Sequence, residues 1–227
     1  MDGFSGHVFC DFGGSCLRFL IRVIIPNFAA LIESPYYYPV MQLTEVTSKA
    51  LEKEFLLMPL KIYKTDPNYI RPLDKDITNV FDPQKNKAFR FGTCKRWLLA
   101  DDDGEYIGRI AAFVNRRYRN KGDEQKTGGI GFFDCIDNQE AADMLFDVSK
   151  SWLMQNGMEA MDGPINFGER DKWWGLLVEG FDPPIYQMNY NAPYYQKLFE
   201  DYGFKTFFNQ LCFTMPVQVV LDERFKR

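Results

Sequence analysis

The segment 163–204 constrains the fold more than any other part of the chain. It is too rich in Trp and Tyr for a solvated loop, and too rich in Gly, Pro and Asn for one regular element. Proteins commonly use such material where the backbone bends sharply around a pocket. The end of the segment predicts a short helix from Pro193 to Gly203, because Pro favours the first turn of a helix and Gly the position after its last residue.

Strands and helices alternate along the rest of the chain from Met41 onward, without an internal repeat. In the first half the patterns predict a strand at 41–46, a helix that starts after Ser48 and is disturbed at Pro59, an irregular region at 65–87, and a hairpin of strands 96–100 and 105–115. In the second half they predict a strand at 129–136, a helix over 139–156 capped by Asp137 or Asn138, and a strand at 158–162. The helix from Pro193 and a strand at 204–217 complete the order. The 227 residues, 46% of them hydrophobic, suffice for one substantial core.

The charge balance argues against one class of partner. A net charge of −4 and a pI near 5.2 are not those of a dedicated nucleic-acid binder. One basic cluster is present, which we interpret as a solvated loop between two strands. The alternative is a landing site for the phosphates of a nucleotide or of CoA. The cluster consists of Arg116, Arg117, Arg119 and Lys121.

The residues that hold metals are scarce. His7 is the only His, and the five Cys have no metal-ligand spacing, which argues against zinc hydrolases and His-based catalytic triads. We therefore expect no metal site, and reduced thiols in a cytoplasmic protein. The acids 101–103 precede Gly104 without the spacing of a calcium loop, so they predict a hairpin turn.

Residues 1–40 differ in character from the rest of the chain. Segment 17–32 is apolar but contains Arg18, Arg22 and Pro26, which makes a poor membrane span, and no Lys or Arg precedes it, which makes a poor signal peptide. We expect no integral membrane span, a natural start at Met41, and 1–40 as an atypical leader outside the fold. The alternative is a short membrane-associating leader. Residues 41–227 are then expected to form a single domain, which lacks its last strand, supplies a short and poor one after Pro216, or was cut from a longer protein.

The sequence Leu198–Phe204, LFEDYGF, resembles the end of the second conserved helix in the acyl-CoA N-acyltransferase (GNAT) superfamily. The likeness to a divergent bacterial branch of that superfamily extends over 59–77, 103–118 and 131–146, and together it covers most of 41–227. It implies an α/β (α+β) fold, with a mixed, mainly antiparallel twisted sheet and helices on both faces.

The resemblance also implies a set of site residues. A GNAT enzyme binds the CoA pyrophosphate at a helix N-terminus, pairs pantetheine with the backbone of splayed strands, and places an acid and a base at the reacting atoms. The acid is assigned to Tyr195, because Phe199 stands where the family has Tyr, and the base to Glu169. Backbone at Phe132, Phe133 and Asp134 would bind acyl-CoA, such as acetyl-CoA. The acceptor pocket would be lined by Asn166, Trp173, Trp174, Asn189, Asn191 and Tyr194.

Two functions follow from these residues. The first is a GNAT-like acyltransferase that moves an acyl group from acyl-CoA to a small amine. The alternative is a non-catalytic GNAT-fold module that binds a ligand, or pairs with a second such module or a second copy. The alternative is favoured by residues 137–142, which offer two acids and no Gly where the family binds phosphate. Trp173 and Trp174 can line a pocket or act as structural anchors, and for Asn191 a helix cap is the favoured role.

Overall fold

The computed structural model describes residues 15–24, 41–118, 125–169 and 171–213, with the backbone alone for 15–24. The elements follow the chain as β1 (Ser15–Ile24), β2 (Gln42–Glu45), α1 (Lys49–Ile62), α2 (Asp74–Val80), the short 3-10 helix η1 (Lys87–Arg90), β3 (Gly92–Ala100), β4 (Tyr106–Asn115), β5 (Thr127–Cys135), α3 (Gln139–Gln155), β6 (Ala160–Gly163), β7 (Leu176–Glu179), α4 (Tyr195–Tyr202) and β8 (Lys205–Phe213).

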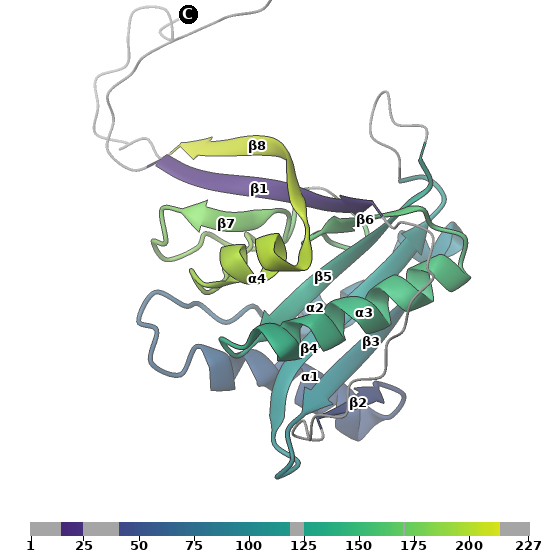
Figure 1. The fold of residues 1–227 in the computed structure, drawn as a ribbon, viewed down its shortest axis with the longest axis horizontal. Helices are drawn as coiled ribbons and strands as arrows, with labels where there is room; N and C mark the ends of the chain where they lie inside the picture. Colours follow the sequence, from purple (N-terminus) through teal and green to yellow (C-terminus); the bar gives the residue numbers. More distant parts are fainter. Residues whose placement is uncertain (1–14, 25–40, 119–124, 170, 214–227) are drawn as a thin grey trace, which may run out of the picture.

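All eight described strands belong to one twisted sheet. Its order is β2-β3-β4-β5-β6-β1-β7, and β8 also pairs with β1 (Figure 1). Every pairing is antiparallel except that of β5 with β6, which is parallel. A parallel pair needs a crossover, and α3 supplies it. The predicted mixed, mainly antiparallel sheet is therefore confirmed.

Helices cover both faces of the sheet, as predicted, because the strands alternate between two hydrophobic cores. Trp97, Leu99 and Ile110 pack on one face with buried residues of α3 and α4. Leu98 and Ala111, one position along, pack on the other face with residues of α1 and α2. In Figure 1, α3 and α4 lie in front of the sheet, and α1 and α2 lie behind it.

The local signals placed most elements correctly. Ser48 accepts a hydrogen bond from the Leu51 N–H at 3.3 Å, and Asn138 accepts one from the Ala141 N–H at 2.9 Å, so both predicted caps are present. Gly203 ends α4 with a left-handed φ of 107°. The prediction for Pro59 was wrong, since α1 continues through it to Ile62. Strand β7 was not predicted.

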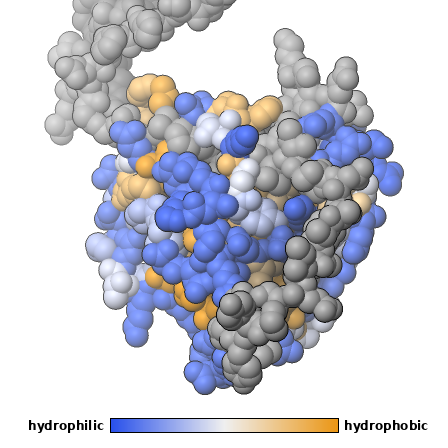
Figure 2. Space-filling model, in the orientation of Figure 1, coloured by the Kyte–Doolittle hydropathy of each residue, from blue (hydrophilic) through white to orange (hydrophobic). Residues whose placement is uncertain are grey.

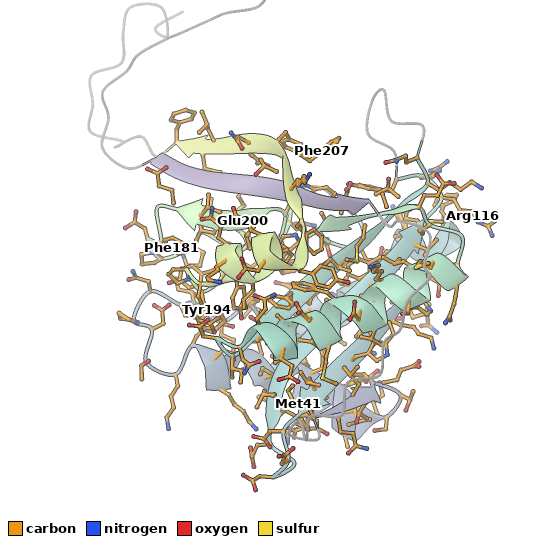
Figure 3. All side chains as sticks on the ribbon, viewed as in Figure 1. Met41, Arg116, Phe181, Tyr194, Glu200 and Phe207 are labelled. Atoms are coloured by element: carbon orange, nitrogen blue, oxygen red, sulfur yellow. The ribbon has the colours of Figure 1, made fainter. Side chains whose placement is uncertain are left out.

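Strand β1 lies within the segment expected to be a leader. Its backbone runs between β8 on one side and β6 with β7 on the other. Exposed apolar side chains of β8, among them Phe207 and Phe213, lie along the same edge of the molecule (Figures 2 and 3). A domain that begins at Met41 remains a prediction, and residues 214–227, where a last strand was in doubt, lie outside the described part. None of the described helices has the length and apolarity to cross a membrane.

Candidate functional site

The parallel strands β5 and β6 part after a short contact. Thr127–Gly129 pairs with Ala160–Asp162, and the Ile165 N–H then donates to the Ile130 carbonyl at 2.7 Å. Beyond Ile130 the backbone of β5 has left its pairing with β6. Two residues, Phe132 and Phe133, oppose Ile110 of β4, which makes a β-bulge, and Phe132 has a φ of +50°. The bulge residues Phe132 and Phe133 thus lie at the space between the two parted strands.

A cavity of about 50 Å³, the inner cavity, fills that space. Its walls come from β5 and α4, from single residues of β4, β7 and α2, and from loops, and they include Tyr69, Arg109, Phe133, Asp134, Asn189 and Tyr195. The volume holds a few water molecules and is far below the roughly 300–1,000 Å³ of ligand pockets. A substrate of ordinary size therefore does not fit the inner cavity as it stands, where the Tyr69 and Tyr190 rings lie with their centres 6.0 Å apart.

Four side chains form a buried polar network beside this cavity. Arg109 Nε donates to Asp134 Oδ2 at 2.7 Å, and its guanidinium also donates to the Phe55 carbonyl. The Tyr63 hydroxyl donates to Asp134 Oδ1 at 3.0 Å. The Tyr195 hydroxyl accepts from the Cys135 N–H at 2.9 Å and lies 3.5 Å from Asp134 Oδ1. This set of Tyr63, Arg109, Asp134 and Tyr195 is called the Asp134 cluster below.

The environment keeps both hydroxyls of the cluster protonated. Burial raises the pKa of Tyr195 well above its ordinary value of 10, and Tyr63 and Asp134 raise it further. Burial also raises the pKa of Tyr63, with the charge of Asp134 as the next cause. The neighbouring Cys135 thiol has its pKa raised by burial to about 12. At neutral pH the cluster thus offers proton donors beside a carboxylate.

Tyr195 and the predicted backbone residues lie together at the inner cavity. Phe132, Phe133 and Asp134 line it on β5, and Tyr195 faces them from α4. Tyr194 donates its hydroxyl to the Cys135 carbonyl at 2.7 Å, on the side of α4 marked in Figure 3. The strand edge where Cys135 lies is therefore occupied by two hydroxyls.

The predicted acceptor residues divide between two places. Trp173, Asn189 and Asn191 line the inner cavity. Asn191 accepts from the Leu177 N–H and donates to the Leu177 carbonyl, which ties it to β7, and α4 begins without a side-chain cap. Asn166 lines a different, outer cavity. Trp174 is buried in the hydrophobic core behind the sheet.

Glu169, the predicted base, lies at the surface. Its side chain is 74% exposed and pairs with Lys172 at 2.9 Å. The hydrogen bond from Lys172 lowers the pKa of the Glu169 carboxyl. It lines the outer cavity and not the inner one. The carboxylate beside Tyr195 is that of Asp134.

Sequence reasoning missed the side chains of Arg109, Asp134 and Tyr63. One signal was available for Arg109: it interrupts the apolar run of β4, where a buried Arg demands a carboxylate partner. Which acid would meet it depends on how β5 pairs with β4, and periodicity does not give that register.

The start of α3 offers little to a phosphate. Asn138 already accepts from the Ala141 N–H, and Asp137 and Glu140 stand beside it. Of the basic cluster, Arg116 and Arg117 are exposed, and the Arg117 guanidinium lies 3.8 Å from the Phe91 ring centre. Arg119 and Lys121 lie outside the described residues.

Comparison with known proteins finds two curated bacterial relatives of this chain. The chain is 31% identical to protein YghO of Escherichia coli over 153 residues, which is 67% of this chain and 38% of that protein. It is 29% identical to the bacterial ceramide synthase of Caulobacter vibrioides over 160 residues, 70% of this chain and 41% of that protein. The chain thus spans about two fifths of the length of both. No family model and no solved structure matches it.

Proposed function

We propose that this chain carries the acyl-transfer site of a GNAT-like N-acyltransferase, which moves an acyl group from acyl-CoA to a small amine. The observation that carries the proposal is the parting of β5 and β6 at the Phe132 bulge, with the Asp134 cluster beside the gap. A thioester laid along the edge of β5 at 132–134, just before the two hydroxyls at Cys135, would meet a protonated Tyr195 and a buried carboxylate at its reacting atoms.

The residues present suit the chemistry of amide formation. The amine nitrogen attacks the thioester carbonyl, so that a C–N bond forms and the C–S bond breaks. The leaving thiolate takes the proton of the Tyr195 hydroxyl. The proton lost by the amine passes to Asp134 and, across the 3.5 Å contact, back to Tyr195. The step therefore balances without any other reactant.

One relative supports the reaction class. Ceramide is by definition an amide of a fatty acid with a long-chain amine, so a ceramide synthase forms an amide bond of the proposed kind. The match covers 70% of this chain but only part of the relative, and the amine and the acyl group of this chain are left to experiment.

Calorimetry and kinetics test the proposal together. Acetyl-CoA and palmitoyl-CoA are titrated separately, and at least one is expected to bind. Tyr195→Phe is expected to lower kcat by about 10²–10⁴-fold, because the thiolate loses its proton donor. Tyr202→Phe is the matched control on the same helix, since its hydroxyl bonds Asp147 at the surface, and it should leave kcat unchanged. Equal activity of the two variants would remove Tyr195 from the reaction.

A second candidate function has its own observation. The N-terminus of α3 carries Asp137 and Glu140 and is already capped by Asn138, which disfavours a CoA pyrophosphate. This favours a non-catalytic GNAT-fold module that binds another ligand or partner. If neither acyl-CoA binds at millimolar concentration, only this second function remains.

A further inference from the structure

A second cavity, the outer cavity, lies on the α2 side of the sheet and has the size of a ligand site. Its volume is about 470 Å³, within the roughly 300–1,000 Å³ of small-molecule pockets. Its walls come from α2, from η1, from the residues that end and follow β4, and from the loop that follows β6. It is separate in its lining from the Asp134 cluster, and Trp173 is the residue that both cavities share.

Positive charge gathers at the rim of the outer cavity. Lys85, Lys87 and Arg117 line it, and all three are exposed. Within the described ranges, no ion pair engages any of them. The two acids of the lining are engaged, since Glu169 pairs with Lys172 and Asp76 accepts from the Tyr186 hydroxyl at 2.6 Å. In a chain of net charge −4, this rim attracts anions.

Two buried polar atoms of the lining residues have no partner. Asn166 and Trp173 are both more than nine-tenths buried, and Asn166 Oδ1 and Trp173 Nε1 lack a hydrogen bond. A buried polar group left unpaired costs about 1–3 kcal/mol, so native proteins rarely keep one without a use. Nε1 can only donate, and Oδ1 can only accept. A ligand that satisfies both must carry an acceptor and a donor.

Backbone strain is concentrated in the same wall. Three described residues other than Gly have positive φ, and two of them, Trp173 at 43° and Gln187 at 62°, line the outer cavity. The Trp173 N–H donates to the Gln187 carbonyl at 2.9 Å, which couples the two strained residues. Such outliers cluster where a protein holds a side chain for a ligand.

We propose that the outer cavity binds a small organic anion, one with a phosphate or carboxylate group and an N–H or O–H donor. The anionic group lies among Lys85, Lys87 and Arg117 at the rim. Asn166 Oδ1 and Trp173 Nε1 are closed to solvent in this structure, so the wall must open before the ligand donates to the first and accepts from the second. This site goes beyond the proposed acyl transfer, and its test measures binding alone, so that either conclusion can fail without the other.

Three probes separate the parts of the proposal in calorimetric titrations. O-Phosphoethanolamine carries a phosphate and an amine, β-alanine a carboxylate and an amine, and ethanolamine the amine alone. At least one of the two anionic probes is expected to bind tenfold or more tightly than ethanolamine, and their order identifies the preferred anion. Equal affinities for all three would overturn the proposal.

Matched variants locate the binding. Lys87→Gln combined with Arg117→Gln should weaken the better probe by about tenfold or more. Lys53→Gln combined with Lys64→Gln removes the same charge from exposed positions outside the lining, and it should change the affinity less than twofold. If both double variants lose affinity equally, the binding reflects net charge and the site is refuted.

The indole of Trp173 provides a second readout. Binding of an acceptor to Nε1 should change the tryptophan fluorescence of the protein, and Trp173→Phe should abolish that change and weaken binding several-fold. Trp97→Phe is the control, since Trp97 packs in the core on the opposite face of the sheet. A fluorescence change that survives in Trp173→Phe and vanishes in Trp97→Phe would contradict the proposed contact.

Discussion

At the scale of residues, the Asp134 cluster is where we expect a single substitution to change the free energy of unfolding most. The side chains of Arg109 and Asp134 are each less than a tenth exposed and form an ion pair at 2.7 Å. Charges taken out of water are tolerated only when each compensates the other. The cluster is therefore the place where a single substitution separates a buried charge from its partner.

Arg109→Met is expected to lower the free energy of unfolding by about 3–5 kcal/mol, because Asp134 is left as an uncompensated buried charge. Lys61→Met removes a cation of the surface pair with Glu105, also at 2.7 Å, and should cost less than about 1 kcal/mol. Urea denaturation measures both. A loss in Arg109→Met as small as in the control would mean that water reaches the pair.

The buried tyrosines predict a loss of stability in alkali. The pKa values of Tyr63 and Tyr195 are raised in the folded state, so above pH 10 the unfolded chain releases protons that the folded chain keeps. The contribution of these tyrosines should be fully present below pH 10 and should be lost as the pH rises, by up to about 1.4 kcal/mol per pH unit for each tyrosine. Cys135, with its pKa raised from 9 to about 12, adds a loss of similar slope that begins earlier, near pH 9.

The measurement is urea denaturation at pH 8 to 11, for the natural sequence and for Tyr63→Phe. The variant lacks one raised hydroxyl, so its stability should fall less steeply above pH 10. Parallel curves for the two proteins would show that Tyr63 titrates alike in the folded and unfolded states.

At the scale of elements, the contact between β5 and the chain after β6 depends on two glycines. A Cβ on Gly131 would lie 1.9 Å from the Ile165 carbonyl oxygen, which is backbone. A Cβ on Gly129 would lie 2.2 Å from Ile165 Cδ1, the flexible end of a side chain. The backbone can yield only by breaking the bond from the Ile165 N–H to the Ile130 carbonyl.

Gly131→Ala is therefore expected to destabilise the protein by about 1 kcal/mol or more beyond Gly129→Ala. The two variants make the same substitution on one strand, two residues apart, so each serves as the control of the other. Thermal and urea denaturation give the difference. A greater cost at Gly129 would mean that the Ile165 side chain is the more rigid obstacle.

Helices with a capping residue or a terminating glycine in the sequence were predictable. Ser48, Asn138 and Gly203 carry local start and stop signals, and the helices they bound were placed correctly. Strand β7 is only four residues long, and although Gly175 and Gly180 flank it, its pairing with β1 is what defines it as a strand. The site divides in the same way: Tyr195 and the β5 backbone were named from a sequence pattern, whereas Arg109 and Tyr63 reach Asp134 only through pairing and packing.

At the scale of the whole molecule, β1 joins parts that are far apart in the sequence. It pairs with β6, β7 and β8, and in the described part of the chain it is the only strand partner of β7 and of β8. Without β1, three strand edges lose these hydrogen bonds, and β8 exposes apolar residues such as Phe207 and Leu211 beside its free edge.

Deletion of residues 1–40 is expected to lower Tm by more than about 5 °C, given that each kcal/mol shifts Tm by about 2–4 °C in a domain of this size. It should also promote self-association through the freed edges. Deletion of residues 1–14, which keeps β1, is the control and should leave Tm unchanged. An unchanged Tm and a monomeric protein after the longer deletion would support a fold that begins at Met41.

The indole of Trp173 forms part of the wall of both cavities. Ligands bound in the two cavities would both contact this side chain, so binding in one cavity would change the shape of the other. Thermodynamic linkage makes such an influence mutual and equal in both directions. Titration of either cavity with the other already filled would therefore measure how firmly this one side chain is held.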